Sequence, residues 1–319
     1  MSASAHQADS ASLALRSVSV VVPCRFEPLV GETVRTVLEV ARAEGAASIE
    51  ILVVGTGDWT CLPADSAIRV IEPEQPLWSG PARNRGLAEA RGDLVVFLDA
   101  DCQPLPGWYR GIQAAQAERP SICAGAIVSS TDNFWQACYN VCCFREYLVD
   151  LPRSSRRFLP SYCLSGPRSA FQGIGGFDES WPGAEDLDLT VRLARAGWPL
   201  WFDPAIQVLH RPASRSFERI VRHGWAHGGT SMRARRAYPE AFGMTRWSTA
   251  PVTLSTLGPL VSAYFLIRTY QQHPRFRSIS LRGSLAIYLF RLAWCLGAAW
   301  SGLRPGTVFR PVANKGTSQ

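Results

Sequence analysis

The fold is decided by the stretch Leu94-Val95-Val96-Phe97-Leu98-Asp99-Ala100-Asp101, an apolar run that ends in two carboxylates one residue apart. Consecutive apolar residues of this length are typical of a strand buried on both faces, as in a parallel sheet. Acidic residues at the carboxyl end of such a strand lie where open α/β sheets bind ligands. Because Asp99 and Asp101 repel each other, a cation between them is favoured. Carboxylates suit Mg²⁺ or Mn²⁺, which also bind phosphate oxygens, so the stretch predicts a metal and diphosphate site.

Strand and helix patterns alternate on both sides of this run. Strands are expected at residues 18–22, 49–54, 68–71 and 122–128, and helices near 31–44, 81–90, 108–117 and 185–196. Such alternation predicts βαβ units, and therefore an α/β protein with a mainly parallel open sheet flanked by helices. Residues 129–165 are aromatic, contain several cysteines and are expected to be irregular.

Further motifs follow in a fixed order along the chain. They are Ser19–Pro23, Ile49–Val54, Gly80–Gly86, Gly92–Asp101, Gly175–Glu179, Gly183–Leu189 and Asp203–Arg211. In these motifs the chain resembles the family 2 glycosyltransferases, which are nucleotide-sugar enzymes with the GT-A fold. The resemblance implies a GT-A-type fold and the inverting transfer of a sugar from a nucleoside-diphosphate sugar to a hydroxyl acceptor. Lipid-linked glycan, glycolipid or cell-surface polysaccharide synthesis is the expected context. The Gln-x-x-Arg-Trp motif of processive synthases is absent, which favours single-sugar transfer.

The resemblance also assigns donor and metal residues. Asp101 is expected to bind a divalent metal, Mn²⁺ or Mg²⁺, and Asp99 to bind it through water or to bond the ribose. His210, at the end of a strand-like run, is expected to complete the metal shell. A strand-end histidine bonded only to the backbone is the alternative reading of His210. The remaining expected donor contacts are Pro23, Glu27 and Arg83.

A second acidic cluster supplies the expected catalytic base. Glu185 and Asp186 open a predicted helix and match the Glu-Asp pair of the family. The helix dipole stabilises acids at this position, and we expect it to lower the pKa of Asp186 and keep the carboxylate ionised as the base. Asp188 is expected to cap the helix or face solvent. A single base opposite the leaving group implies one in-line displacement with inversion.

Two departures from the family pattern concern the nucleotide base. Arg25 and Phe26 stand where the family usually has Tyr and Asn, and Gly55 replaces an Asp that commonly bonds uracil. Asp58 or Asp65 is a substitute for that Asp, so the sequence leaves the identity of the base open.

Length and composition fit one large α/β core with an appendage, since the chain has 319 residues, 47% of them hydrophobic and 18% charged. We expect a disordered tail at 1–16, a catalytic domain at 17–230 and a membrane-associated helical region at 231–319. Within the catalytic domain, residues 17–128 are the expected donor-binding half and 129–230 the acceptor-binding half. The net charge of +7 includes a basic amphipathic helix around Arg215, Arg219 and Arg222. It is better explained by a surface-lying helix than by a nucleic-acid site, so no nucleic-acid partner is expected.

Two apolar stretches close the chain, at Ser248–Ile267 and Gly283–Leu303. We favour a shallow hairpin at the cytoplasmic face of the cell membrane over two spans or a packed soluble appendage. Two spans place a basic loop outside the cell, against the positive-inside tendency. That loop contains Arg268, Arg275, Arg277 and Arg282.

Two rival functions remain. A nucleotidyl or phosphosugar transferase needs a Gly-rich loop with a lysine near the first strand, and Pro23-Cys24-Arg25-Phe26 is not one. A non-catalytic membrane scaffold on a degenerate transferase fold is favoured by Gly55 and Arg25, but Asp99, Asp101, Asp186 and His210 oppose it.

Overall fold

The computed structural model describes residues 16–129, 133–213, 216–278 and 280–304. Residues 1–15 of the predicted tail and Arg215 of the predicted basic helix lie outside the described residues. All nine cysteines of the chain are described, and all are free thiols, as is typical of a reduced protein.

A nine-stranded sheet forms the centre of the described chain. Its strands are β1 (Val18–Arg25), β2 (Ile49–Thr56), β3 (Ile68–Ile71), β4 (Leu94–Leu98), β5 (Cys102–Pro104), β6 (Ile122–Ser129), β7 (Ser154–Ser155), β8 (Cys163–Pro167) and β9 (Leu200–His210). They follow the order β3-β2-β1-β4-β8-β6-β9-β5, and β7 pairs with β9. Strands β3, β2, β1 and β4 are parallel, and β8 runs antiparallel to both β4 and β6. The predicted α/β class is confirmed, with a mixed sheet.

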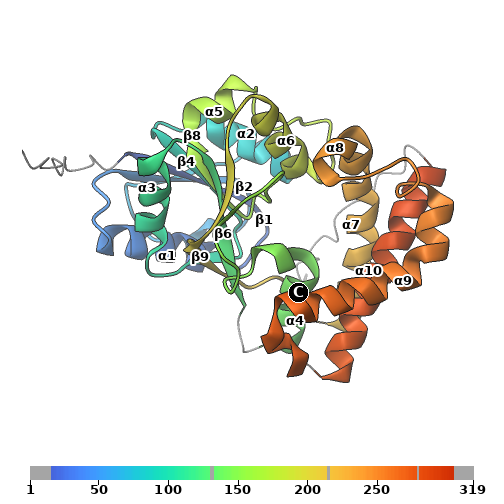
Figure 1. Cartoon of the computed structure of the whole chain (residues 1–319). Helices are drawn as coiled ribbons and strands as arrows, with labels where there is room; N and C mark the ends of the chain where they lie inside the picture. The colour runs from blue at the N-terminus through green and yellow to red at the C-terminus, as the bar shows by residue number, and fades with distance from the viewer. Residues whose placement is uncertain (1–15, 130–132, 214–215, 279, 305–319) are drawn as a thin grey trace, which may run out of the picture.

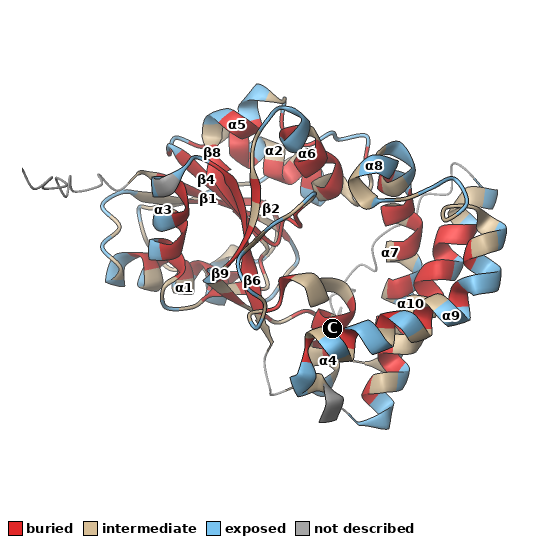
Figure 2. Cartoon of the chain, viewed as in Figure 1, coloured by how far each residue is buried: buried red, intermediate tan, exposed pale blue. Residues whose placement is uncertain are grey.

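The helices of the described chain lie on both faces of this sheet and, from α7 on, to one side of it. They are α1 (Val30–Ala43), α2 (Ser79–Glu89), α3 (Trp108–Glu118), α4 (Phe134–Phe144), α5 (Arg168–Gly173), α6 (Glu185–Arg195), α7 (Phe217–Ala237), α8 (Pro239–Phe242), α9 (Pro251–Gln272) and α10 (Leu281–Leu303). Short 3₁₀ turns are η1 (Trp59–Cys61), η2 (Arg145–Tyr147) and η3 (Pro274–Ser278). Because parallel crossovers are right-handed, α1, which leads from β1 to β2, and α2, which leads from β3 to β4, lie on opposite faces. Figure 2 shows the buried strands between these layers.

The stretch at 129–165 is not irregular as predicted, because it contains α4 and the start of β8. The Asn133 side chain accepts hydrogen bonds from the backbone N–H groups of Trp135 and Gln136, which starts the helix. Val141 and Cys142 are on the buried face of this helix. Since the buried residues include polar Asn140, apolar periodicity alone does not reveal the helix.

Helix α10 packs against both α7 and α9, and Figure 1 shows these three helices on one side of the sheet. The α7–α10 crossing is close, because Cβ atoms at Gly228 and Gly297 would lie 2.1 Å from the carbonyl oxygens of Trp294 and Trp225. In the described part of the chain, α10 is the one helix long and apolar enough to cross a membrane, and 50% of its most apolar window is buried within the protein. Helix α7 continues through residue 230, the expected domain boundary.

Candidate active site

Strand register brings the two expected metal ligands together. Cys102 at the start of β5 pairs with His210 at the end of β9, and the Arg211 N–H bonds the Asp101 carbonyl at 3.0 Å. The Asp101 carboxylate consequently lies 3.6 Å from Nε2 of His210. Burial raises the pKa of Asp101, but His210 outweighs this effect and holds the pKa below its usual value. The Cys102 thiol joins these groups, so that one ligand atom from each lies within 4.8 Å of the others.

Asn140 on α4 holds His210 in one orientation. The amide nitrogen of Asn140 donates to the His210 carbonyl and to Ser129, so its oxygen accepts from Nδ1 of His210 at 2.7 Å. With the hydrogen on Nδ1, the lone pair of Nε2 faces Asp101 and suits a metal ion. The His210 ring therefore bonds a side chain, unlike a histidine bonded only to the backbone, which was the alternative reading. Asn140 is a residue that the sequence does not point to, since it lies in the stretch expected to be irregular.

Asp99 turns away from this pair toward Arg83. The buried Arg83 guanidinium donates to Asp99 at 2.6 Å and to Glu185 at 2.9 Å, and it lies 5.5 Å from the Phe177 ring. Burial opposes the charge on Arg83, but Asp99 and Glu185 outweigh it and hold the pKa above its usual value. Arg83 thus joins the end of β4 to the start of α6.

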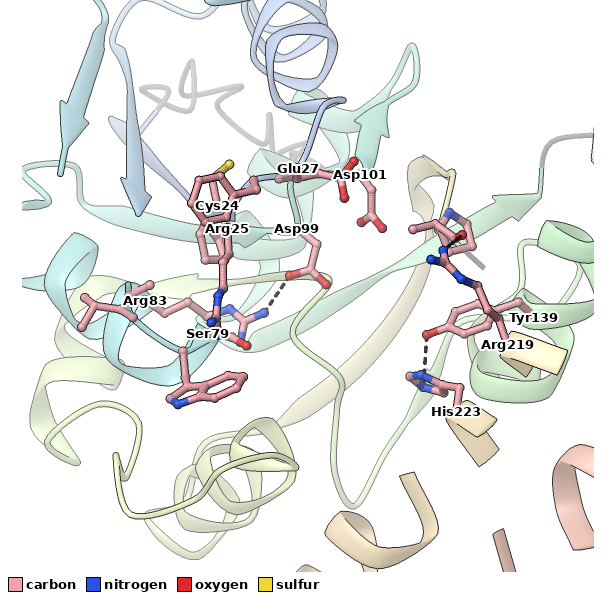
Figure 3. A pocket seen from close by; sticks show the side chains of 18 residues that line it. Cys24, Arg25, Glu27, Ser79, Arg83, Asp99, Asp101, Tyr139, Arg219 and His223 are labelled. Carbon is pink, nitrogen blue, oxygen red and sulfur yellow. Dashed lines mark hydrogen bonds and ion pairs between the residues drawn. The ribbon is translucent and has the colours of Figure 1, made fainter. Parts of the chain in front are cut away.

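A cavity of about 540 Å³ opens at the carboxyl ends of β1 and β4, the usual ligand position in an open α/β sheet. Figure 3 shows Arg83 and Ser79 on one wall and Tyr139, Arg219 and His223 on the opposite wall, with Asp99 and Asp101 between them. The expected donor contacts all line it: Pro23, Glu27, Arg83, Asp99 and Asp101. Arg25 and Trp78 also line this cavity, and the guanidinium carbon of Arg25 lies 4.5 Å from the centre of the Trp78 ring.

A second cavity of about 440 Å³ adjoins the first. We call the first one the donor-side cavity, because the expected donor contacts line it. Both are lined by Ser79, Arg83, Asp99, Tyr139 and His223, so they meet at these residues. We call the second one the acceptor-side cavity, because the expected catalytic acids Glu185 and Asp186 line it. Tyr139 bonds His223 at 3.1 Å across the junction. Burial, and then the neighbouring His210, lower the pKa of His223 to about 4, so its ring is neutral near pH 7.

The expected low pKa of Asp186 is wrong. Burial, and then the neighbouring Glu185 carboxylate, raise its pKa to about 7. The backbone N–H groups of Leu187 and Ser161 bond the Asp186 carboxylate at 2.8 and 3.3 Å, which opposes the rise without cancelling it. Asp188 also differs from expectation: it is 2% exposed and bonds Arg192 and Tyr238.

Neither substitute expected for the uracil-bonding Asp lines the donor-side cavity. Asp58 caps η1 through Thr60, and Asp65 pairs with Arg42. Gly55 has φ of +144°, and a Cβ there would lie 1.7 Å from the Cys24 carbonyl oxygen. A side chain is therefore excluded at Gly55 unless β1 or β2 shifts.

Tyr139, Arg219 and His223 line the donor-side cavity although the sequence gives them no site role. They come from α4 and α7, which approach the sheet only in the folded chain.

Residues 19–171 match the family model described as glycosyl transferase family 2.

The chain is 29% identical over 275 residues to a pre-mycofactocin glycosyltransferase of Mycobacterium tuberculosis, covering 79% of this chain and 53% of the relative. It is 27% identical to the N-acetylglucosaminyl-diphospho-decaprenol L-rhamnosyltransferase of the same species, covering 61% of this chain and 59% of that protein. The chain therefore spans little more than half the length of these curated relatives.

Solved structures give the same fold. A mannosyltransferase from Pyrobaculum calidifontis, solved with GDP-Man and Mn²⁺, superposes with a TM-score of 0.55 at 16% identity, over 91% of this chain and 88% of its own. The structure of GalNAc-T7 with UDP, GalNAc and Mn²⁺ gives 0.50 at 15% identity, over 83% of this chain and 57% of its own. The resemblance seen in the sequence is confirmed, since residues 19–171 match the model of glycosyl transferase family 2 and the relatives are glycosyltransferases.

Proposed function

We propose that this protein is an inverting glycosyltransferase that moves one sugar from a nucleoside-diphosphate sugar to a hydroxyl acceptor. The observation that carries the proposal is the junction of the two cavities. Asp101, which forms a cluster suited to a metal ion with the buried His210, lines the donor-side cavity, and Asp186 lines the acceptor-side cavity. The match of residues 19–171 to the glycosyl transferase family 2 model and the nucleotide sugar bound by the Pyrobaculum mannosyltransferase support the donor class.

Asp101 and His210 fit a divalent metal, Mn²⁺ or Mg²⁺, since they offer a carboxylate oxygen and an imidazole Nε2 whose orientation Asn140 fixes. When bound there, the ion supplies positive charge to the diphosphate leaving group. The Arg83–Asp99 pair lies beside this position, where Asp99 can bond the ribose or a metal-bound water. Arg219, from the opposite wall, adds positive charge to the same cavity.

Asp186 is the proposed base. A pKa of about 7 leaves it partly ionised at neutral pH and gives it enough basicity to take the acceptor hydroxyl proton. The acceptor oxygen bonds to the anomeric carbon as the bond from that carbon to the diphosphate oxygen breaks. The hydroxyl proton goes to Asp186 and the nucleoside diphosphate leaves. A single displacement of this kind inverts the anomeric centre.

Association with the cytoplasmic face of the membrane is part of the proposal. Helix α9 exposes Leu257, Leu260, Tyr264 and Ile267, which recur at helical spacing and are 46–68% exposed. Leu281 and Leu303, at the two ends of α10, are also exposed. The packing of α10 against α7 and α9 favours a surface-lying attachment over two spans. The name of the mycobacterial rhamnosyltransferase includes a lipid-linked substrate, a diphospho-decaprenol, which supports the membrane context.

The activity is tested with the purified full chain and a panel of nucleotide sugars. We expect at least one donor to raise the melting temperature in the presence of Mn²⁺, and to release its nucleoside diphosphate when acceptor is added. Glu74→Gln, on the exposed surface, is the control and should behave as the parent does. If no nucleotide or nucleotide sugar binds with Mn²⁺ or Mg²⁺, the scaffold alternative is correct.

The attachment is tested by sedimentation with phosphatidylglycerol vesicles. We expect the parent chain to sediment and Leu260→Glu, which places a charge on the exposed face of α9, to remain in the supernatant. Val70→Glu is a matched control, because Val70 is 40% exposed on β3, far from α9 along the sheet. Equal sedimentation of all three proteins would contradict the assigned face.

A further inference from the structure

The acceptor-side cavity has a basic part of its lining. Three arginines from three separate elements line it: Arg145 from η2, Arg235 from α7 and Arg291 from α10. Segments distant in sequence thus place three guanidinium groups in one cavity of about 440 Å³. Arg291 and Arg282 are the two charged residues of α10, and Arg291 is the one that lines the cavity.

Two aromatic rings connect these arginines. The guanidinium carbons of Arg145 and Arg291 lie 4.3 and 5.2 Å from the centre of the Phe265 ring. Those of Arg291 and Arg235 lie 4.0 and 5.0 Å from the centre of the Trp294 ring. Cation–π contact offsets part of the cost of burying the charges, but it leaves three like charges close together.

Protein groups leave part of this cluster unsatisfied. Glu146 pairs with Arg145 at 3.4 Å, and Arg235 donates to the Ser231 carbonyl. Among the described residues, the buried Nη1 of Arg145 and Nε of Arg291 have no hydrogen-bond partner. Burial, and then repulsion by Arg291, lower the pKa of Arg235 to about 9, so it remains charged at neutral pH. His227 nearby has a pKa of about 3, because of burial and then His223, and adds no charge. An anion in the cavity would relieve this imbalance.

The placement of the cluster connects it with the acceptor. Asp186 and the five residues shared with the donor-side cavity line the same cavity. An anion on the arginines and a hydroxyl facing Asp186 would therefore occupy one continuous cavity. The rings of Phe265, Phe290 and Trp294 give the cavity an apolar lining as well.

We propose that Arg145, Arg235 and Arg291 bind the phosphate or diphosphate group of an amphiphilic acceptor, and that the cluster selects acceptors by this group. The inference rests on the proposed glycosyl transfer for the identity of the acceptor, but not for the binding itself. A phosphate or diphosphate fits better than a carboxylate, because it has more charge and more acceptor oxygens to share among three guanidinium groups.

The test measures binding of geranyl diphosphate to the full chain by calorimetry, in EDTA so that no metal draws the diphosphate to Asp101. We expect Arg235→Gln and Arg291→Gln each to weaken binding about tenfold or more, the usual scale for a charge-assisted hydrogen bond. Arg233→Gln is the matched control, because Arg233 lies on the same helix but outside the cavity, against Trp181 and the Ser180 carbonyl. It should bind as the parent does.

Melting temperatures separate this role from a structural one. If the arginines await an anion, removing one relieves repulsion, so Arg291→Gln without ligand should melt at or above the parent temperature. Two results together would show that the cluster is structural and would overturn the proposal. The first is a marked fall in the melting temperature of Arg291→Gln. The second is unchanged binding of geranyl diphosphate in Arg235→Gln and in a folded Arg235→Lys variant.

Three further ligands decide the chemistry. Geraniol, which lacks the head group, and decanoate, which has a carboxylate, should both bind more weakly than geranyl diphosphate. Equal binding of either would overturn the phosphate assignment. Loss of sedimentation with phosphatidylglycerol vesicles in Arg291→Gln would instead assign the cluster to bilayer lipid and overturn it too. Nucleotide binding with Mn²⁺ should survive in each variant. Its absence from the parent chain would refute the proposed function while leaving the diphosphate site intact.

Discussion

Asp186 gives the sharpest test of the proposed chemistry, because its raised pKa predicts a particular pH dependence. With a pKa of about 7, roughly a tenth of Asp186 is ionised at pH 6 and about nine tenths at pH 8. The rate of sugar transfer at saturating donor should therefore rise about tenfold between these pH values. Asp186→Asn keeps the shape but cannot accept a proton, so it should lose about 10² to 10⁴-fold in turnover with little change in donor affinity.

The assay is single-turnover transfer from a radiolabelled nucleotide sugar across pH 5.5 to 8.5. Asp178→Asn is the control, since Asp178 is exposed and bonds Ser180 and Trp181. A rate that stays flat over this range, or full activity of Asp186→Asn, would refute the assignment. If Glu185→Gln is inactive and Asp186→Asn is active, the base is Glu185.

Stability provides a second measurement of the same pKa. Since the folded pKa lies above the unfolded value, the folded chain holds this proton between about pH 4 and pH 7 while the unfolded chain does not. Asp186 therefore lowers stability as the pH rises through that window. Asp186→Asn should remove this loss, and at pH 8 it should melt at a higher temperature than the parent chain.

Three other outcomes follow from the geometry. Asp101→Asn should lose at least ~100-fold in Mn²⁺-dependent nucleotide affinity, and His210→Ala should weaken it, as measured by nucleotide titration with and without Mn²⁺; unchanged Mn²⁺ dependence in both would contradict the metal assignment. Asn140→Leu removes the acceptor for Nδ1 of His210 and should weaken metal affinity about 10 to 100-fold in the same titration, whereas equal affinity would show that Asn140 does not orient the ring. Gly228→Leu forces a side chain onto the Trp294 carbonyl and should lower stability by roughly 1–3 kcal/mol or more in thermal melting, while Gly173→Ala, with open space around it, should not; equal melting of both would contradict the close crossing of α7 and α10.

Local sequence patterns were sufficient for the parallel half of the sheet. Strands β3 and β4 have the predicted bounds, and β4 in particular is a short apolar run with clear ends. In β4 all five residues are fully buried, which is the environment that such a run indicates. The carboxylates that follow β4 were recognised for the same reason.

Properties that depend on tertiary packing were not predictable in this way. The helix dipole alone suggests an ionised Asp186, but burial and Glu185, which act together only in the folded cavity, determine the opposite shift. Asn140 occupies its position beside His210 because α4 packs at the end of β9, and no spacing in the sequence encodes that contact. The arginine cluster likewise combines η2, α7 and α10.

The repulsion between Asp99 and Asp101 shows how local and tertiary effects combine. The sequence requires a cation near two carboxylates so close together. In the folded chain the Cys102 N–H bonds the Asp99 carbonyl in a turn, and the two side chains find different partners. Asp99 binds Arg83, while Asp101 faces His210. Because Arg83 also binds Glu185, the acid on the donor side is fixed to the helix that carries the proposed base. The spacing of the two carboxylates therefore divides the site, with one acid left facing the metal position and the other linking donor and acceptor sides.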